Sequence, residues 1–356
     1  MKKVSKRNRI VEEDLKDIIS SPLPWNILAG KTILITGATG FIAGYLVESL
    51  LFLNEKKIFE PIKIICLARN KEKLSNKYIF YKNRSDLDFL VQDVCETINQ
   101  KNAIHYIIHA ASYATPSKYG IDPVGTLMPN IIGTYNLLEL SRKQPIKGFL
   151  FLSSGEIYGN FQIPKRDIKE NIFGFLNPLL LRSCYAESKR MGENMCNSWS
   201  SQYHIPMKIV RLFHTYGPGM NLHDGRAHSD FIGDVVENKD ILIKSDGKST
   251  RAFSYISDTV KGIFTVLLKG LGCEAYNIGG DKIVSINQLA KLIANADSKK
   301  KIIINKDINK RGKEYLVSSL KKQYPINLDK IKSLGWRPIY SPKQGIKRTL
   351  DSFLYI

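Results

Sequence analysis

The sequence is poor in the features that mark disulfide-rich, metal-binding and membrane proteins. Its five cysteines in 356 residues are scattered and odd in number, and none forms a Cys-x-x-Cys pair, so we expect neither disulfides nor a bound metal. No apolar run approaches the roughly 18 residues of a membrane span. The basic first residues are not followed by an apolar signal core. We therefore expect a cytoplasmic protein without a membrane partner.

The sequence also lacks a nucleic-acid-binding motif, although its net charge of +20 favours anionic partners. The basic residues are spread along the whole chain, mostly as lysine, and form no stripe interleaved with aromatic residues. This distribution favours a lysine-rich solvated surface over a nucleic-acid groove. With 43% hydrophobic residues the chain can bury a sizeable core, so we predict a globular protein with no nucleic-acid partner.

The rest of the chain is organised around an apolar strand, a glycine-spaced turn and a helix. We predict the strand over residues 32–36 and the helix over 41–53, where apolar residues recur at helical spacing. Gly37 and Gly40 lie between them, and Ala43 stands where a third glycine could follow. The unpaired N–H groups and the dipole of a helix start suit a pyrophosphate, and glycine lets it approach the backbone. The stretch favours a nucleotide-cofactor seat over a purely structural turn.

Strand and helix patterns alternate up to about residue 155, which predicts a doubly wound parallel α/β sheet of the Rossmann type. Further strands are expected at 208–213 and 274–278, among loops typical of a smaller mixed α/β lobe. Short apolar runs and a helical run give the other elements, namely strands at 62–67, 87–93, 106–111 and 148–154 and a helix at 131–142. The expected units are an N-terminal extension (1–29) with an amphipathic helix at 11–19, a dinucleotide-binding domain (30–213), and a mainly substrate-binding lobe (214–356) whose residues near 255–280 return to the first domain.

The end of the second strand bears on the choice of cofactor. An acidic residue there would hold the ribose hydroxyls of NAD, whereas an arginine can hold the extra phosphate of NADP. The sequence has no acid at this point and does have Arg69. This favours NADP, although a solvated loop residue and a stack on adenine remain open for Arg69.

Tyr185 and Lys189 are the sharpest candidates for chemistry. They are four residues apart, so on a helix they share one face. A lysine ammonium beside a phenol lowers the pKa of the phenol, which makes tyrosine usable as a general base. Ser154, at the end of a strand, could hold the same hydroxyl. His109, within another strand, is expected to be a packed residue rather than a catalyst.

Taken together, the motifs resemble the extended short-chain dehydrogenases/reductases, in the branch that acts on nucleotide sugars. The resemblance runs from residue 31 to about 350, and within the branch the chain is most similar to the UDP-glucuronate decarboxylases. The matching motifs are residues 36–44, 153–159, 182–190, 214–218, 224–226 and 250–255.

This resemblance implies a common first step. Tyr185, assisted by Ser154 and Lys189, removes the proton of a sugar hydroxyl while hydride passes to the nicotinamide, giving a 4-keto sugar. A sugar with a carboxylate one carbon beyond can then lose carbon dioxide, and the hydride can return. Glu156 matches a glutamate placed near carbon five, where it handles a proton. Such a reaction would serve the synthesis of surface-polysaccharide precursors.

The resemblance also assigns the contact residues and partners. The implied catalytic residues are Ser154, Glu156, Tyr185 and Lys189. The implied substrate contacts are Ser154, Gly155, Glu156, His214, Asp224, Arg226 and Arg251. The implied cofactor contacts are Gly37, Thr39, Gly40, Phe41, Ile42, Arg69, Asp93, Val94, Ala110, Ala111, Ser112, Tyr185 and Lys189. The expected partners are a nucleotide-diphosphate sugar, NAD or NADP, and a second copy of the chain that pairs through helix 131–142 and the helix carrying Tyr185.

Three positions depart from the decarboxylase pattern. Gly155 replaces a serine, where sugar dehydratases carry an aspartate, so dehydration lacks its acid. His214 replaces an asparagine, and Gly219 replaces an arginine. The last two changes count against a carboxylate substrate, while the shared motifs keep decarboxylation as the nearest expectation, followed by 4-epimerisation. The alternatives are an NADP-dependent reductase or dehydrogenase, a 4,6-dehydratase, and a non-catalytic dinucleotide-binding protein.

Overall fold

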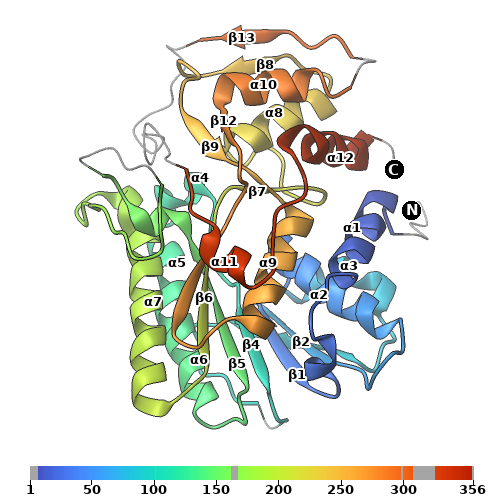
Figure 1. Cartoon of the computed structure of the whole chain (residues 1–356), viewed down its shortest axis with the longest axis vertical. Helices are drawn as coiled ribbons and strands as arrows, with labels where there is room; N and C mark the ends of the chain where they lie inside the picture. Colours follow the sequence, from blue (N-terminus) through green and yellow to red (C-terminus); the bar gives the residue numbers. More distant parts are fainter. Residues whose placement is uncertain (1–6, 101, 162–166, 298–299, 308–324, 355–356) are drawn as a thin grey trace.

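The structure, a computed structural model, describes residues 7–100, 102–161, 167–297, 300–307 and 325–354. Its centre is a seven-stranded sheet in the order β11-β6-β5-β4-β1-β2-β3, with every neighbouring pair parallel (Figure 1). The order reverses between β1 and β4, and in such sheets ligands bind outside the carboxyl ends of the strands at that point. The strands are β1 (Thr32–Thr36), β2 (Lys63–Ala68), β3 (Leu87–Val91), β4 (Tyr106–His109), β5 (Gly148–Ser154), β6 (Met207–Leu212) and β11 (Glu274–Ile278).

The inner strands of the sheet are buried on both faces, whereas the edge strand β3 is partly exposed. Successive strand side chains point to opposite faces. Ile33 and Ile35 of β1 pack into one apolar core, and Leu34 between them packs into the other. In β2, Ile64 and Ile65 repeat this alternation. Burial on both sides explains the unbroken apolar runs 33–35 in β1 and 64–68 in β2.

Helices cover the two faces of the sheet. One core contains side chains of α1, α2 and α9, and the other contains side chains of α6 and α7 (Figure 1). The helical segments up to the end of α7 are α1 (Arg9–Ile19), η1 (Trp25–Leu28), α2 (Phe41–Asn54), α3 (Lys71–Lys77), η2 (Ile79–Tyr81), α4 (Pro116–Tyr119), α5 (Pro123–Met128), η3 (Pro129–Gly133), α6 (Thr134–Ser141), η4 (Gly155–Tyr158), η5 (Leu181–Ser183) and α7 (Cys184–Tyr203).

The expected elements are present; β6 ends one residue before the predicted end, and two other strands end two residues early. β3 ends at Val91 and β4 at His109, each two residues before the expected end. At β4 the Thr36 hydroxyl accepts hydrogen bonds from the backbone N–H groups of Ala110 and Ala111, both at 3.1 Å, so these groups leave the strand ladder. The helix expected over 131–142 is α6, preceded by the π-helical segment η3.

A smaller group of elements lies over the carboxyl edge of the sheet (Figure 1). It contains three two-stranded pairs: β7 (Thr215–Tyr216) with β10 (Ser254–Tyr255), β8 (Ile241–Ile243) with β13 (Ile304–Lys306), and β9 (Thr250–Ala252) with β12 (Ile283–Ser285). The later helices are α8 (Ala227–Val236), α9 (Ile256–Lys269), α10 (Ile286–Ala294), α11 (Asp329–Ser333) and α12 (Pro342–Leu354). α9 and β11 return to the sheet, as the sequence predicts, while the exact domain limits remain a proposal.

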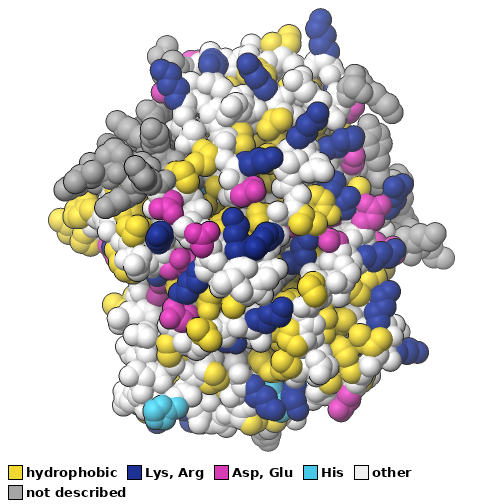
Figure 2. Space-filling model, in the orientation of Figure 1, with side chains coloured by type: hydrophobic (Ala, Val, Ile, Leu, Met, Phe, Trp, Pro, Cys, Tyr) yellow, Lys and Arg dark blue, Asp and Glu magenta, His cyan; other side chains and the backbone are white. Residues whose placement is uncertain are grey.

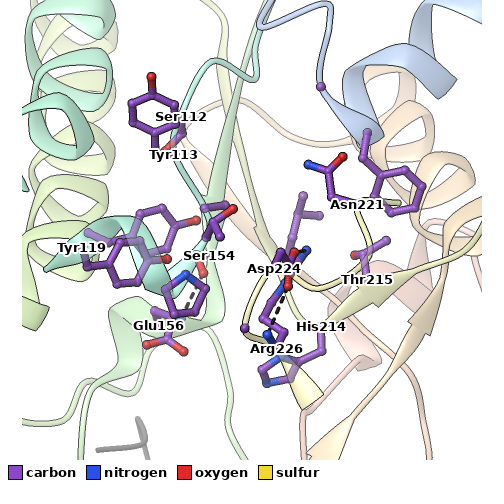
Figure 3. A pocket seen from close by; sticks show the side chains of 18 of the residues that line it. Ser112, Tyr113, Tyr119, Ser154, Glu156, His214, Thr215, Asn221, Asp224 and Arg226 are labelled. Carbon is purple, nitrogen blue, oxygen red and sulfur yellow. Dashed lines mark hydrogen bonds and ion pairs between the residues drawn. The ribbon is translucent and has the colours of Figure 1, made fainter. Parts of the chain in front are cut away.

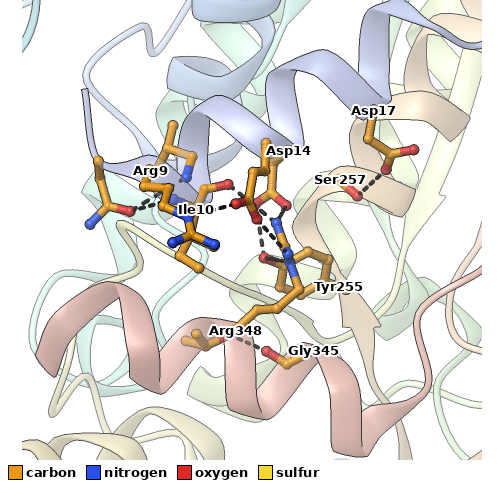
Figure 4. Close-up of polar contacts among 12 residues, drawn as sticks. Arg9, Ile10, Asp14, Asp17, Tyr255, Ser257, Gly345 and Arg348 are labelled. Atoms are coloured by element: carbon orange, nitrogen blue, oxygen red, sulfur yellow. Dashed lines mark hydrogen bonds and ion pairs between the residues drawn. The ribbon is translucent and has the colours of Figure 1, made fainter. Parts of the chain in front are cut away.

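The N-terminal helix is fixed to the body of the protein by polar contacts (Figure 4). Asn8 caps α1 by accepting a hydrogen bond from Ile10 N–H at 3.0 Å. Asp14 of α1 is fully buried and accepts hydrogen bonds from Arg348 of α12 and from Tyr255, each at 2.8 Å. After the helix, the Trp25 ring packs edge-on against Phe264.

The visible face carries Lys and Arg side chains that are scattered rather than gathered into one stripe (Figure 2). Within the described part of the chain, no helix has the length and apolarity to cross a membrane. The same residues include no group of three or more His, Cys, Asp or Glu side chains that could hold a metal ion.

Candidate functional site

A cavity of about 2130 Å³ lies between the carboxyl edge of the sheet and the smaller group of elements. Its walls include every residue that the sequence analysis assigned to the site. These are Gly37, Thr39, Gly40, Phe41, Ile42, Arg69, Asp93, Val94, Ala110, Ala111, Ser112, Ser154, Gly155, Glu156, Tyr185, Lys189, His214, Asp224, Arg226 and Arg251. The fold therefore brings the two sets of candidates, for cofactor and for substrate, into one continuous space.

The glycine turn has the geometry of a phosphate cradle. Gly37 has a φ of +65°, and a Cβ there would meet the Ala111 Cα at 2.8 Å, so the turn fits against the end of β4 only as glycine. Gly40 forms the N-cap of α2, and no side chain caps this helix start. The first N–H groups of α2 thus remain available to a phosphate.

The cavity wall beside the turn offers a buried polar group. Ser112 follows the small residues Ala110 and Ala111, and its hydroxyl oxygen is buried with no hydrogen-bond partner among the described residues. Buried polar groups are normally hydrogen-bonded. Together with the glycine cradle, this unpartnered hydroxyl fits a seat for a dinucleotide.

Arg69 already has partners in the protein. Its guanidinium forms a 3.3 Å ion pair with Asp93 and donates a hydrogen bond to the Tyr113 hydroxyl. It also stands over the Tyr113 ring, 5.4 Å from the centroid. The Tyr113 contact was not foreseen from the sequence, because it depends on the loop after β4 folding back towards β2.

Tyr185 lies in the cavity wall near the start of α7, within reach of the end of β5. Burial raises the pKa of Tyr185 to about 12, and a hydrogen bond with the Ser154 hydroxyl acts in the opposite direction. The ring of Tyr119 stacks on the Tyr185 ring, with 5.1 Å between centroids and 10° between planes. Tyr119 fixes the orientation of the phenol, and it too was missed, because the pairing of α4 with α7 has no local signal in the sequence.

Lys189 lies near Tyr185 on α7, and its ammonium has a backbone partner on β5. Its ammonium donates a 2.6 Å hydrogen bond to the backbone carbonyl of Leu152 and lies 5.9 Å from the centroid of the Tyr185 ring. Burial lowers the pKa of Lys189 to about 7. The lowering of the phenol pKa by Lys189 stays a prediction, since in this structure the ammonium donates to the Leu152 carbonyl of β5.

Glu156 and its neighbours form the polar floor of the cavity, with Glu156 on the same side as Ser154 and Tyr119 (Figure 3). Arg182, from the segment before α7, forms a 3.2 Å ion pair with Glu156. Arg182 is the first residue of the motif at 182–190, and the resemblance gives it no role. This ion pair fixes the carboxylate position.

The opposite wall is basic and contains imidazoles (Figure 3). Arg226 and Asp224 are ion-paired, which holds this arginine at the wall. Burial lowers the pKa of His214 well below its usual value, and Arg251, His228 and Arg226 lower it further. His228 is 3% exposed, and its Nε2 atom has no hydrogen-bond partner in the described structure. Phe253 contacts both imidazole rings, at centroid distances of 5.8 and 5.5 Å.

His109 is not part of the catalytic group. It is buried, and its Nδ1 and Nε2 atoms lie 2.8 Å from the Thr36 hydroxyl and 3.1 Å from the Pro129 carbonyl. Burial lowers the pKa of His109 to about 3. The expectation of a packed strand residue is confirmed.

Comparison with known proteins was made for both sequence and structure. A family model described as the NAD dependent epimerase/dehydratase family matches residues 33–279. UDP-glucuronic acid decarboxylase 3 of Arabidopsis thaliana is 31% identical over 322 residues, which cover 90% of this chain and 88% of that protein. UDP-glucuronic acid decarboxylase 1 of Xenopus tropicalis is 30% identical over 328 residues, which cover 91% of this chain and 72% of that protein.

Among solved structures, one similar chain is UDP-glucuronic acid 4-epimerase from Bacillus cereus, in complex with UDP-glucuronic acid and NAD. It superposes with a TM-score of 0.74 at 25% identity, and the match covers 90% of this chain and 98% of that one. The parallel sheet with helices on both faces is therefore shared with a protein whose structure contains a nucleotide sugar and NAD.

Proposed function

Because the chain belongs to the NAD dependent epimerase/dehydratase family, we propose that it is an enzyme that modifies a nucleotide sugar through a 4-keto intermediate. The observation that carries this proposal is the position of Ser154, Glu156, Tyr185 and Lys189 in the cavity that the glycine turn also enters. A non-catalytic dinucleotide-binding protein would need the turn but not this group.

In the proposed reaction, NAD accepts a hydride from carbon 4 of the sugar and can return it. Tyr185 takes the proton of the sugar hydroxyl, since it is the buried phenol that Ser154 contacts. Burial alone leaves its pKa too high for a base at neutral pH, so the phenol requires a nearby positive charge in the working complex. We propose that the Lys189 ammonium supplies that charge after leaving the Leu152 carbonyl.

Decarboxylation of a UDP-glucuronate-like sugar and 4-epimerisation are the reactions that we propose first. Both start from the same 4-keto sugar, and the Glu156–Arg182 ion pair keeps a proton-handling carboxylate fixed beside it. Gly155 argues against dehydration, because the position carries no acid and a Cβ there would meet the Phe213 ring at 2.4 Å. The arginines of the opposite wall suit the diphosphate or a sugar carboxylate.

NAD is the cofactor that we propose, in preference to the NADP suggested by Arg69. The guanidinium is engaged by Asp93 and Tyr113, so binding an extra phosphate would require exchange of these contacts. An acidic group, Asp93, also lies in this part of the cavity wall. The preference is tested by comparing the dissociation constants of the two cofactors.

We propose a homodimer that forms through α6 and α7, which lie along one side of the molecule (Figure 1). Tyr135 of α6 is 45% exposed and Met191 of α7 is 49% exposed, which leaves apolar side chains on these helices in contact with water. Light scattering of the purified protein should give twice the chain mass. Met191→Glu should shift it towards one chain mass, and a monomeric parent protein would refute the dimer.

One experiment tests the proposed activity. The purified protein is incubated with UDP-glucuronate, UDP-glucose and dTDP-glucose, with and without NAD or NADP, and the products are weighed by mass spectrometry. Loss of carbon dioxide identifies a decarboxylase, and an unchanged mass with a new retention time identifies an epimerase. Loss of water or gain of two hydrogens would instead identify the dehydratase or the reductase. No turnover of any nucleotide sugar, with Tyr185→Phe indistinguishable from the parent, would refute the enzyme proposal.

A further inference from the structure

Lys77 lies against the glycine turn, although it comes from the end of α3 and far along the chain from the motif. Its ammonium donates hydrogen bonds to the backbone carbonyls of Gly40, at 2.9 Å, and Thr39, at 3.3 Å. Lys77 also lines the cavity beside Gly37 and Gly40. The side chain thus holds the last two residues of the turn from the side of α3.

A cation at this place needs a compensating partner. The start of a helix carries partial positive charge, so an ammonium near the first turn of α2 is electrostatically unfavourable. Burial lowers the pKa of Lys77, which is the effect of removing the charged form from water. Among the described residues, Lys77 forms no ion pair with a carboxylate within 4.0 Å, and the Glu48 carboxylate acts on it from farther away, which partly offsets the lowering of its pKa. Lys77 and the start of α2 thus both place positive charge beside the turn, which suits an anion.

Gly44 makes room for this lysine. A Cβ placed on Gly44 would lie 2.4 Å from the Lys77 Nζ and 2.5 Å from its Cε, and its three nearest atoms all belong to Lys77. Glycine inside a helix is less favourable than alanine, so its presence in α2 calls for a local reason. The contact with Lys77 supplies that reason.

We propose that Lys77 and Gly44 form one positioning unit of the dinucleotide seat, which holds the Thr39–Gly40 backbone and adds a fixed positive charge for a phosphate of the cofactor. This inference rests on the proposed function. The phosphate is that of the pyrophosphate bridge or the extra phosphate of NADP, and the two sources differ in which cofactors lose affinity when the charge is removed.

The first test measures the dissociation constants of NAD, NADP and UDP for the full-length protein by calorimetry. Lys77→Met keeps the length and apolar stem of the side chain but removes the charge. We expect it to weaken dinucleotide binding about tenfold, the loss of one charge-assisted interaction, and to leave UDP affinity unchanged. An equal loss of affinity for NAD and NADP identifies the pyrophosphate as the group that Lys77 contacts. A larger loss of affinity for NADP identifies the extra phosphate of NADP instead. Unchanged affinity for both would overturn the inference.

The second test is a double-mutant cycle. Gly44→Ala should weaken dinucleotide binding in the parent protein, because the new methyl group displaces the Lys77 ammonium. In a Lys77→Ala background the same substitution should cost no further affinity and should raise the melting temperature. Equal losses in both backgrounds would show that Gly44 serves another purpose and would refute the coupling.

Binding measurements on the parent protein and on the Lys77 variants distinguish failure of the proposed cofactor seat from failure of the role of Lys77. If the parent protein binds neither NAD nor NADP, the proposed dinucleotide seat is wrong, and this inference falls with it. If the parent binds a dinucleotide and the Lys77 variants bind it equally well, only the role of Lys77 is refuted. UDP binding by each variant shows that the chain is folded.

Discussion

The buried ion pair between Asp14 and Arg348 fixes the N-terminal helix. Removing this ion pair should lower the stability of the folded protein. Asp14→Ala deletes a carboxylate that accepts hydrogen bonds from Arg348 and Tyr255 at 2.8 Å each and from Tyr45 at 3.2 Å. These three partners belong to α12, β10 and α2, which are far apart in the sequence. The substitution therefore removes the shared acceptor of three elements.

The size of the stability loss depends on the contacts that Arg348 keeps after Asp14→Ala. Breaking a buried ion pair usually costs about 3–5 kcal/mol, because the surviving charge is left unpaired. Arg348 keeps a second carboxylate, Glu13, at 3.0 Å, which places the expected loss at the lower end. We expect Asp14→Ala to lower the free energy of unfolding at pH 7 by about 3 kcal/mol.

The pH dependence should run opposite to that of an exposed ion pair. Burial raises the pKa of Asp14 from 3.8 to about 6, so the folded state holds a proton that the unfolded state releases. The stability that this linkage contributes is fully present below pH 3.8 and is lost as pH rises through about 6. The cost of Asp14→Ala should accordingly be larger at pH 5 than at pH 7, by about 1 kcal/mol.

Urea denaturation of the parent and the variant at pH 5 and pH 7 measures both quantities. Glu12→Gln is the matched control, since Glu12 lies on the same helix and its 2.8 Å ion pair with Lys16 is exposed. Glu12→Gln should lower the free energy of unfolding by less than about 0.5 kcal/mol. A cost of Asp14→Ala that shrinks as the pH falls would show that the attraction of Arg348 outweighs burial and would refute the reasoning.

Three further substitutions test the site. Tyr185→Phe should lower kcat by at least about 100-fold, the usual contribution of a general base, while calorimetry finds the affinity for the nucleotide sugar nearly unchanged. Lys189→Met should abolish turnover yet raise the melting temperature at pH 7, because burial lowers the pKa of Lys189 to about 7 and the folded state holds this charge poorly. His228→Phe should leave the melting temperature equal or higher, since it removes the partnerless Nε2 atom, and should weaken sugar binding about tenfold in calorimetry if that imidazole serves the substrate.

The parts of the fold that depend on local pattern could be predicted from the sequence. The predictions of an apolar strand before Gly37 and of an apolar helix after Gly40 are correct, because strand, turn and helix follow one another directly in the chain. The family resemblance drawn from the motifs is confirmed by the family match over residues 33–279. The motif residues also meet in one cavity, because parallel strands bring their carboxyl ends to the same edge.

The residues that the sequence analysis missed depend on tertiary contacts. Tyr119 and Lys77 touch the site through a ring stack and through backbone carbonyls, and neither contact has a sequence period or motif. The spacing of Lys189 from Tyr185 predicts a shared helix face, and the ammonium lies 5.9 Å from the centroid of the Tyr185 ring. Spacing sets the helix face, whereas the direction of a long side chain is set by the nearest acceptor, here the Leu152 carbonyl. The role of Gly44 became visible only with Lys77 beside it.

The contacts of α1 also bear on how the two walls of the cavity are held together. Tyr45, which donates to Asp14, lies one helical turn after Phe41 of the cofactor wall, and the two rings contact each other at 6.0 Å. Tyr255, which also donates to Asp14, comes two residues after Phe253 of the opposite wall. The buried Asp14 carboxylate thus accepts hydrogen bonds from α2, which carries part of the cofactor wall, and from β10, which follows a residue of the opposite wall. Although α1 precedes the residues matched by the family model, it belongs to the same folded unit as the site, and loosening it should disturb the spacing between the cofactor turn and the substrate side.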